Sequence, residues 1–314
     1  MDPRVKAARF SVISNFSLAL LKFIVALITG SVSILSEAIH SSLDLLAALI
    51  AFFCLRQAIK PANEKFQFGH GKIENVSGVV EALLIFFAAL WIIFESYQKF
   101  VQGSAVESVT LGIFVMAFAS LVNYLISLYL FKVAEKTDSI ALKADAMHLK
   151  TDVLTSIGVL GGLVLIKVTG IQWLDPLSAI AIAILIIKAA IELTLEAFSP
   201  LLDVRLPEEE EEIIISIIRR HSNEFIEFHK LRSRKAGAER HIDLHMVVPY
   251  NQPVVRVHEI CDQIENEIAA IFPCSHVLIH MEPCKASCIK CDYLGPCAPP
   301  TPVPENEEAD PKGR

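Results

Sequence analysis

Two short segments place a histidine and an aspartate four residues apart inside long apolar stretches. His40 precedes Asp44 in the first segment, and His148 precedes Asp152 in the second. Residues four apart lie on one face of a helix, so each pair presents an imidazole and a carboxylate together. If the two faces meet, two imidazoles and two carboxylates surround one point, a donor set that suits tetrahedral zinc.

The repetition of the pair favours a site over an incidental histidine, which can simply hydrogen-bond a backbone carbonyl. A central Asp or Lys in a membrane span costs about 2.5–3.5 kcal/mol on insertion scales, so such residues are functional candidates. Glu37 and Asp145 precede the two histidines by three residues, and we interpret them as supporting groups or as residues near the interface. Two other charged residues lie in apolar stretches: we interpret Lys22 as a snorkelling lysine and Glu81 as a glutamate facing the helix bundle.

The composition indicates two unlike parts of the chain. A mean hydropathy of +0.50 and 53% hydrophobic residues exceed the values of ordinary soluble domains. Residues 1–200 contain 30 charged residues, whereas the last 114 contain 33. We therefore expect a membrane domain followed by a water-soluble one. The net charge of −7 gives no reason to expect a nucleic-acid partner.

Six apolar segments reach the length of about 20 residues that a transmembrane helix needs. They are 10–30, 32–55, 76–98, 107–131, 140–166 and 174–198. Lysine and arginine concentrate before the first segment, between the second and third, and near the turn between the fourth and fifth. The positive-inside rule therefore predicts that both termini lie in the cytoplasm.

The sequence after residue 207 is typical of a soluble fold. Glutamates at 208–212 favour the start of a helix, because they complement the positive end of its dipole. Strands are predicted at about 225–233, 241–248 and 276–282, with an amphipathic helix at about 254–271. The order α-β-β-α-β predicts one sheet covered by two helices.

We therefore predict three regions. Residues 1–203 form an all-α transmembrane domain of six helices, and residues 204–284 form a cytoplasmic α+β domain with a ferredoxin- or metallochaperone-like order of elements. Residues 285–314 are a tail whose composition favours disorder. Four cysteines near its start are candidates for a zinc, copper(I) or iron–sulfur site, although their spacing fits no standard motif and an idle tail is the alternative. They are Cys284, Cys288, Cys291 and Cys297.

These features together resemble the cation diffusion facilitators, and most of all their bacterial zinc and ferrous-iron efflux members. The resemblance rests on the six spans, the two His-x3-Asp pairs, the sequence Phe-Gly-His-Gly-Lys-Ile-Glu at 68–74 and the α-β-β-α-β region. It implies a homodimeric exporter in the inner (plasma) membrane, which exchanges a cytoplasmic divalent metal for protons by alternating access and is not an enzyme. The implied transport site consists of His40, Asp44, His148 and Asp152.

The resemblance also implies a binuclear zinc site of the cytoplasmic domain, at the dimer interface, with a structural or regulatory role. The matching residues are His229, His245, His258, His280 and Glu282, where glutamate replaces the family's aspartate. A solvated sheet face with scattered histidines is the alternative, and it suffices for His241, Asp243 and His276, which match no family ligand.

Two further family positions lie near the membrane surface. The family's loop site, Asp-x2-His-x3-His, matches Asn63, Phe66 and His70, so only its last ligand is present and we expect the site to be lost or weak. Lys72 and Asp203 match a salt bridge that joins the membrane and cytoplasmic parts of family members. An ordinary juxtamembrane lysine and a helix-end aspartate are the alternative.

Zinc is the expected cargo, because imidazole favours zinc over harder ions. Imidazoles exchange protons in the physiological range, and a protonated imidazole cannot hold a metal. The sequence leaves Fe²⁺, Cd²⁺ and Mn²⁺ open as cargo, and also the number of protons exchanged. The rival classes are an intramembrane metallohydrolase, against which the spans contain no His-Glu-x2-His, and a membrane metal sensor.

Overall fold

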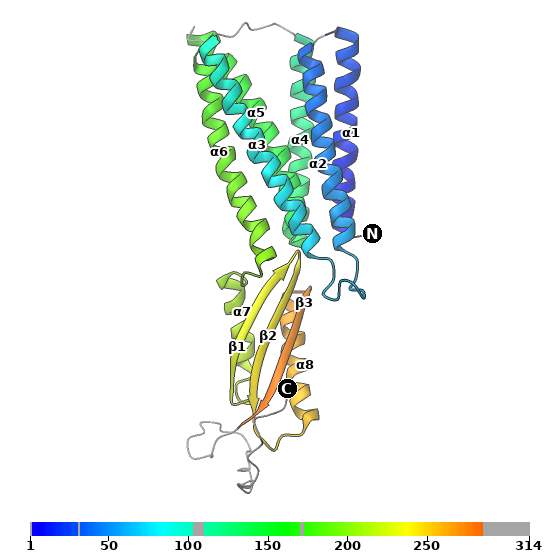
Figure 1. Cartoon of the computed structure of the whole chain (residues 1–314), viewed down its shortest axis with the longest axis vertical. Helices are drawn as coiled ribbons and strands as arrows, with labels where there is room; N and C mark the ends of the chain where they lie inside the picture. Colours follow the sequence, from blue (N-terminus) through cyan, green and yellow to red (C-terminus); the bar gives the residue numbers. More distant parts are fainter. Residues whose placement is uncertain (1, 31, 103–109, 170–172, 285–314) are drawn as a thin grey trace, which may run out of the picture. The chain divides into compact units, whose positions relative to one another are not determined.

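The computed structural model describes residues 2–30, 32–102, 110–169 and 173–284 (Figure 1). The chain divides into two compact units. The helical unit comprises Met1–Val204 with Ala236–Ala238, and the sheet unit comprises Arg205–Lys235 with Glu239–Arg314.

Six long helices build the helical unit. They are α1 (Pro3–Thr29), α2 (Val32–Ala58), α3 (Lys72–Gln102), α4 (Thr110–Thr137), α5 (Ile140–Thr169) and α6 (Leu174–Phe198), followed by a short 3₁₀ helix, η1 (Ser199–Leu202). The predicted all-α region with six helices is confirmed. Two helices, α1 and α3, begin before the predicted apolar segments. The reason is that charged and polar residues continue the helix beyond its apolar part, as at α1, where the Asp2 side chain accepts a bond from the Arg4 backbone N–H.

Within the described residues, five helices are long and apolar enough to cross a membrane: α1, α2, α3, α4 and α6. Helix α5 has 30 residues, which extend over about 45 Å at 1.5 Å per residue. Its first half contains Asp145, His148, Lys150 and Asp152.

Helix α5 is central to the packing of the helical unit. Helix α3 packs mainly against α6, α1 against α2, and α4 against α5 (Figure 1). One buried cluster contains Leu55, Leu130 and Leu149 and joins α2, α4 and α5, while a second joins α3, α5 and α6. Small residues allow close approach: a Cβ atom at Gly78 on α3 would lie 3.1 Å from the Cβ atom of Ala197 on α6. The polar residues of α5 are therefore held against both α2 and α3.

The sheet unit has the predicted α-β-β-α-β order. Its elements are α7 (Glu208–Arg220), β1 (Glu227–Ala236), β2 (Glu239–Val248), α8 (Val254–Ile271) and β3 (Ser275–Pro283). The strands lie in the order β1-β2-β3, and β2 and β3 run parallel with His245 opposite His280. Figure 1 shows α7 and α8 on the same side of the sheet.

Alternation along β2 separates the core from the open face of the sheet. Ile242, Leu244 and Met246 are fully buried together with the apolar side chains of α7 and α8. The residues between them, which include His241 and His245, are only partly buried and lie on the opposite face. This face is the one that the helices leave uncovered.

Candidate metal centres

Three side chains that can bind a metal ion converge inside the helical unit. Asp44 on α2 and His148 and Asp152 on α5 each place a ligand atom within 4.8 Å of the other two. His148 Nε2 donates a 3.1 Å hydrogen bond to Asp44 Oδ1, and these two residues are 8% and 7% exposed. One imidazole and two carboxylates thus face a common point, a donor set that suits a divalent cation.

His40 lies at the edge of this group. Its Nε2 atom is 3.9 Å from Asp44 Oδ1, one helical turn along α2, and its side chain is about half exposed. His40 does not belong to the three residues whose ligand atoms converge. The structure therefore brings together three of the four sequence-predicted residues and places the fourth beside one of them.

Lys22 on α1 forms a buried polar contact beside the ligand-bearing helix α2. Its Nζ atom donates to Ser41 Oγ at 2.7 Å and to Glu37 Oε2 at 3.2 Å, and the residue is 8% exposed. The interpretation of Lys22 as a snorkelling lysine is therefore wrong. A lysine within an apolar segment was visible in the sequence, but its partners depend on how α1 packs against α2.

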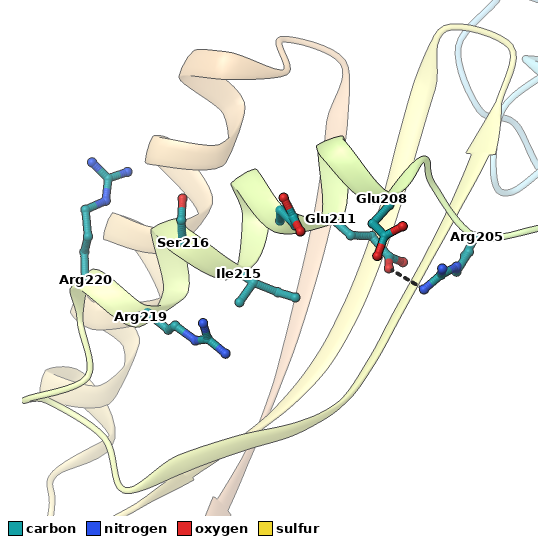
Figure 2. Close-up of a pocket in the computed structure, with 8 residues that line it drawn as sticks. Arg205, Glu208, Glu211, Ile215, Ser216, Arg219 and Arg220 are labelled. Carbon is teal, nitrogen blue, oxygen red and sulfur yellow. Dashed lines mark hydrogen bonds and ion pairs between the residues drawn. The ribbon is translucent and has the colours of Figure 1, made fainter.

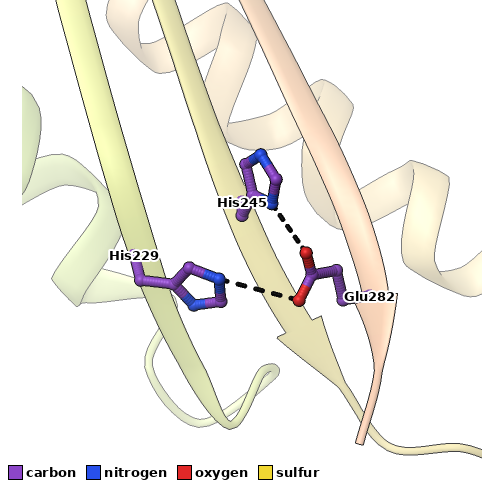
Figure 3. Close-up of side chains that lie close together, drawn as sticks. All are labelled: His229, His245 and Glu282. Atoms are coloured by element: carbon purple, nitrogen blue, oxygen red, sulfur yellow. Dashed lines mark hydrogen bonds and ion pairs between the residues drawn. The ribbon is translucent and has the colours of Figure 1, made fainter.

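A second group of ligands lies on the open face of the sheet (Figure 3). His229 on β1, His245 on β2 and Glu282 on β3 have ligand atoms within 4.8 Å of one another. His245 Nδ1 donates to Glu282 Oε1 at 2.7 Å, and His229 Nε2 lies 3.6 Å from Glu282 Oε2. The hydrogen bond from His245 lowers the pKa of the Glu282 carboxyl group below its ordinary value of 4.5. The carboxylate is therefore ready to bind a cation at neutral pH.

The other two predicted residues of this domain behave differently. The ring of His280 lies 4.7 Å from the ring of His245, because parallel pairing of β2 and β3 sets them side by side. His258 lies on α8, is largely exposed, and its Nδ1 atom is 3.1 Å from Asp262 Oδ1. Since α8 covers the opposite face of the sheet, the described chain does not bring His258 to the other four.

Three polar residues further along the open face form no such group. The rings of His241 and His276 stack with centroids 5.1 Å apart, and Arg232 Nη2 donates to Asp243 Oδ2 at 3.0 Å. These contacts agree with the interpretation of that part of the sheet as a solvated polar face.

The predicted loop site holds one possible ligand whose nitrogens already contact the protein. His70 Nδ1 lies 3.2 Å from the Lys60 carbonyl oxygen, and His70 Nε2 lies 3.4 Å from Asn63 Nδ2. The ring of Phe66 packs 4.5 Å from the His70 ring. The side chains that replace two family ligands therefore surround the third.

The remaining charged features near these sites are ion pairs. Lys72 Nζ donates to Asp203 Oδ1 at 2.9 Å, so the start of α3 is paired with the residue that follows η1, within the helical unit.

Cys284 is partly buried, and the predicted ligands Cys288, Cys291 and Cys297 lie outside the described residues.

A groove runs along the exposed side of α7 (Figure 2). Glu208 and Glu211 line one end and Arg219 and Arg220 the other, a distribution that complements the helix dipole. Arg205 Nη1 pairs with Glu211 Oε2 at 3.2 Å. The groove is lined by neither histidine nor cysteine, so it offers none of the usual zinc ligands.

Comparison with known protein families assigns both units. Residues 8–202 match the model of the cation efflux transmembrane domain, and residues 206–284 match that of the cation efflux protein cytoplasmic domain. The chain belongs to the cation efflux family, the cation diffusion facilitators. The protein is therefore a multi-pass membrane protein of a transporter family and not an enzyme, which excludes an intramembrane metallohydrolase.

Individual relatives span most of the chain. An uncharacterised transporter of Synechocystis sp. is 37% identical over 256 residues, which are 82% of this chain and 83% of the relative. The cation-efflux pump FieF of Yersinia pestis is 32% identical over 289 residues, 90% of this chain and 96% of the relative. The solved structure of CzrB in a zinc form is 36% identical, covers 26% of this chain and 92% of its own, and has a TM-score of 0.25.

Proposed function

We propose that this protein exports Zn²⁺ from the cytoplasm in exchange for protons, and that His40, Asp44, His148 and Asp152 bind the ion in transit. The observation that carries this proposal is the convergence of Asp44, His148 and Asp152 within 4.8 Å inside helices of a membrane transporter. Such a group of ionisable residues is rare in spans and marks an ion pathway.

The chemistry of these residues supports exchange of metal for protons. A neutral imidazole binds zinc, and a protonated imidazole cannot. At low pH, protons therefore bind the imidazole nitrogens and displace the metal ion. Asp44 and Asp152 supply negative charge that offsets the loss of the dication's water shell. His148 Nε2 donates to Asp44 Oδ1, so this hydrogen bond must break before both atoms can bind one ion. Rocking of the helices about this group gives alternating access.

The sheet unit supports a second role for zinc, as a bound structural or regulatory ion in a homodimer. His229, His245 and Glu282 already converge, with the ring of His280 beside them, and two or three imidazoles with one carboxylate suit Zn²⁺. When bound there, the ion links three strands of the sheet. His258 lies on α8 and does not join this group in the described chain, so we expect it to act only through contacts with a second copy.

The distribution of basic residues supports an orientation in which both termini lie in the cytoplasm. We place the protein in the inner (plasma) membrane. We propose the region limits 1–203, 204–284 and 285–314 for the transport, cytoplasmic and tail regions. The Lys72–Asp203 ion pair then holds the last residues of the transport region against the start of α3.

Reconstituted full-length protein tests this function directly. Liposomes with a metal-responsive dye inside are given zinc, ferrous iron, cadmium or manganese outside, with the lumen either acidic or at equal pH. We expect zinc to enter fastest and an acidic lumen to accelerate its entry, with the acceleration lost when a protonophore is added. If none of the four ions enters, metal transport is contradicted. If zinc enters at the same rate with and without the pH difference, proton exchange is contradicted.

A further inference from the structure

Glu81 on α3 is a buried acid that the proposed metal site does not use. It is 1% exposed, and neither of its carboxyl oxygens has a hydrogen-bond partner in the described part of the chain. Ser77, one helical turn earlier, is also buried with its hydroxyl unpaired. Buried polar groups of membrane helices normally find partners, so this exception requires an explanation.

The ionisable groups around Glu81 do not stabilise a negative charge, and the one neighbour that favours it is the neutral Ser77 hydroxyl. Asp145 on α5 and Cys54 on α2 lie close enough to act on Glu81 electrostatically, and both would carry negative charge when ionised. The described charged residues of α6 are exposed: Lys188 pairs with Glu192, and Glu196 pairs with Lys143 of α5. Described ion pairs include none to Glu81.

A second buried glutamate on the same helix shows what a stabilised carboxylate looks like here. Glu74 is also fully buried, seven residues before Glu81 and therefore on the same face of α3. Ser139 Oγ donates to Glu74 Oε1, and Arg4 Nη1 donates to Glu74 Oε2 at 3.3 Å. Glu74 thus receives a cation and a hydroxyl hydrogen bond, whereas in the described part of the chain Glu81 has no cation and only the Ser77 hydroxyl nearby.

We propose that Glu81 is a second proton-binding site, separate from the metal ligands, which holds a proton in this arrangement and releases it when a metal ion enters. An un-ionised carboxyl group is the form that an apolar site without a partner accepts. Asp145 links the site to the ligands, because it lies on α5 one turn before His148 and its Oδ2 atom is also unpaired and buried.

The exchange at Glu81 balances simply. When a dication arrives near α5, the O–H bond of Glu81 breaks, the proton passes to cytoplasmic water, and the carboxylate left behind compensates part of the added positive charge. This inference rests on the proposed metal–proton exchange. It adds one proton per chain to those displaced from the metal ligands.

Infrared spectroscopy of the metal-free full-length protein reads the proton without requiring transport. We expect a carbonyl-stretch band of a protonated carboxyl group that Glu81→Gln removes and that the matched control Glu192→Gln, at an exposed position in another span, leaves in place. If Glu81→Gln fails to fold, wild-type protein labelled at its glutamate carboxyl carbons must show the band shifted. A band that neither labelling nor Glu81→Gln changes overturns the proposal.

Proton counting connects the site to metal binding. Titration calorimetry of detergent-solubilised protein with zinc, in buffers of different ionisation enthalpy, counts the protons released on binding. We expect Glu81→Gln to release about one proton per chain fewer than wild type or Glu192→Gln. Equal release from all three overturns the proposal. The two ideas fail separately: wild type that moves no metal but shows the Glu81 band contradicts the transport function and retains the proton site.

Discussion

The two groups of candidate metal ligands have similar chemistry in opposite surroundings. The side chains of Asp44 and His148 are 9% and 11% exposed and lie in long helices of the helical unit. The side chains of His229, His245 and Glu282 are 33%, 27% and 32% exposed, on an open sheet face. Both groups contain a histidine that donates to a carboxylate, at 3.1 Å inside the bundle and at 2.7 Å on the sheet.

The difference in burial separates the expected roles. Water solvates the charges of the sheet-face group, so an ion can stay there without a change in the rest of the protein. Inside the bundle, water is scarce and each change of ligand charge must be matched by another charge. We therefore expect the buried group to exchange metal for protons, and the exposed group to hold an ion that stabilises or regulates the assembly.

The largest expected effect is the loss of zinc transport when a residue of the buried group is replaced. Replacement of Asp44, Asp152, His40 or His148 by alanine should reduce zinc entry into liposomes by more than about 100-fold, beyond the effect of losing an outer-shell partner of a metal site. The dimer should stay folded and keep its zinc on the sheet unit, measured by size-exclusion chromatography and metal analysis. His276→Ala, a histidine outside both groups, is the matched control. Wild-type flux in any two of the four variants contradicts the assignment.

A smaller effect is expected from the exposed group. His245→Ala combined with His280→Ala should remove zinc from the sheet unit and raise the dimer dissociation constant by about tenfold, equivalent to about 1.4 kcal/mol. Zinc entry should persist and weaken mainly at low zinc concentrations. Analytical ultracentrifugation with and without a zinc chelator measures the first effect, and flux at varied zinc the second. A dimer indifferent to zinc, or a complete loss of flux, contradicts the division of roles.

The smallest effect concerns the pH dependence of the exposed group. The hydrogen bond from His245 lowers the pKa of Glu282 below 4.5. This carboxylate therefore stays ionised as the pH falls from 7 to about 5, and its negative charge is neutralised only below that range. Loss of zinc between about pH 7 and 5 must then come from protonation of the histidines. Glu282→Gln should weaken zinc binding by no more than about tenfold, the lower end of the effect of losing an outer-shell partner of a metal site.

Zinc titrations at several pH values, on protein whose buried site is disabled by Asp152→Ala, measure this dependence. Affinity should decline between pH 7 and 5 as steeply in Glu282→Gln as in its parent. His245→Ala should flatten the decline. A decline that disappears in Glu282→Gln identifies the glutamate, instead of the histidines, as the group that takes up the proton.

Much of the fold follows from local patterns of the sequence. Long apolar segments predict the six helices, and alternation with turn residues predicts the α-β-β-α-β order, because each depends on residues close together in the chain. Helix ends were less predictable: α3 begins at Lys72, before its apolar part, since polar residues extend a helix without changing the hydropathy pattern. The membership of the metal sites stays a prediction that the proposed variants test.

Contacts between elements were beyond the reach of these patterns. Lys22 is charged and lies in an apolar segment, and only the packing of α1 against α2 shows that it bonds Ser41. His258 has the spacing of a family ligand, and only the fold shows that, among the described residues, it does not join the group on the sheet face. Glu81 and Glu74 look alike in the sequence, but Arg4 and Ser139 come only to Glu74.

The sequence by itself determined which residues share a face: His148 with Asp152 on one helix, and His280 with Glu282 on one strand. These relations depend only on the repeat of 3.6 residues in a helix and of two in a strand. The tertiary structure alone decided which faces meet. Asp44 reaches His148 from a helix more than 100 residues away, and parallel register sets His245 beside His280. Side-chain packing and strand pairing fix these distances, and no local spacing contains them.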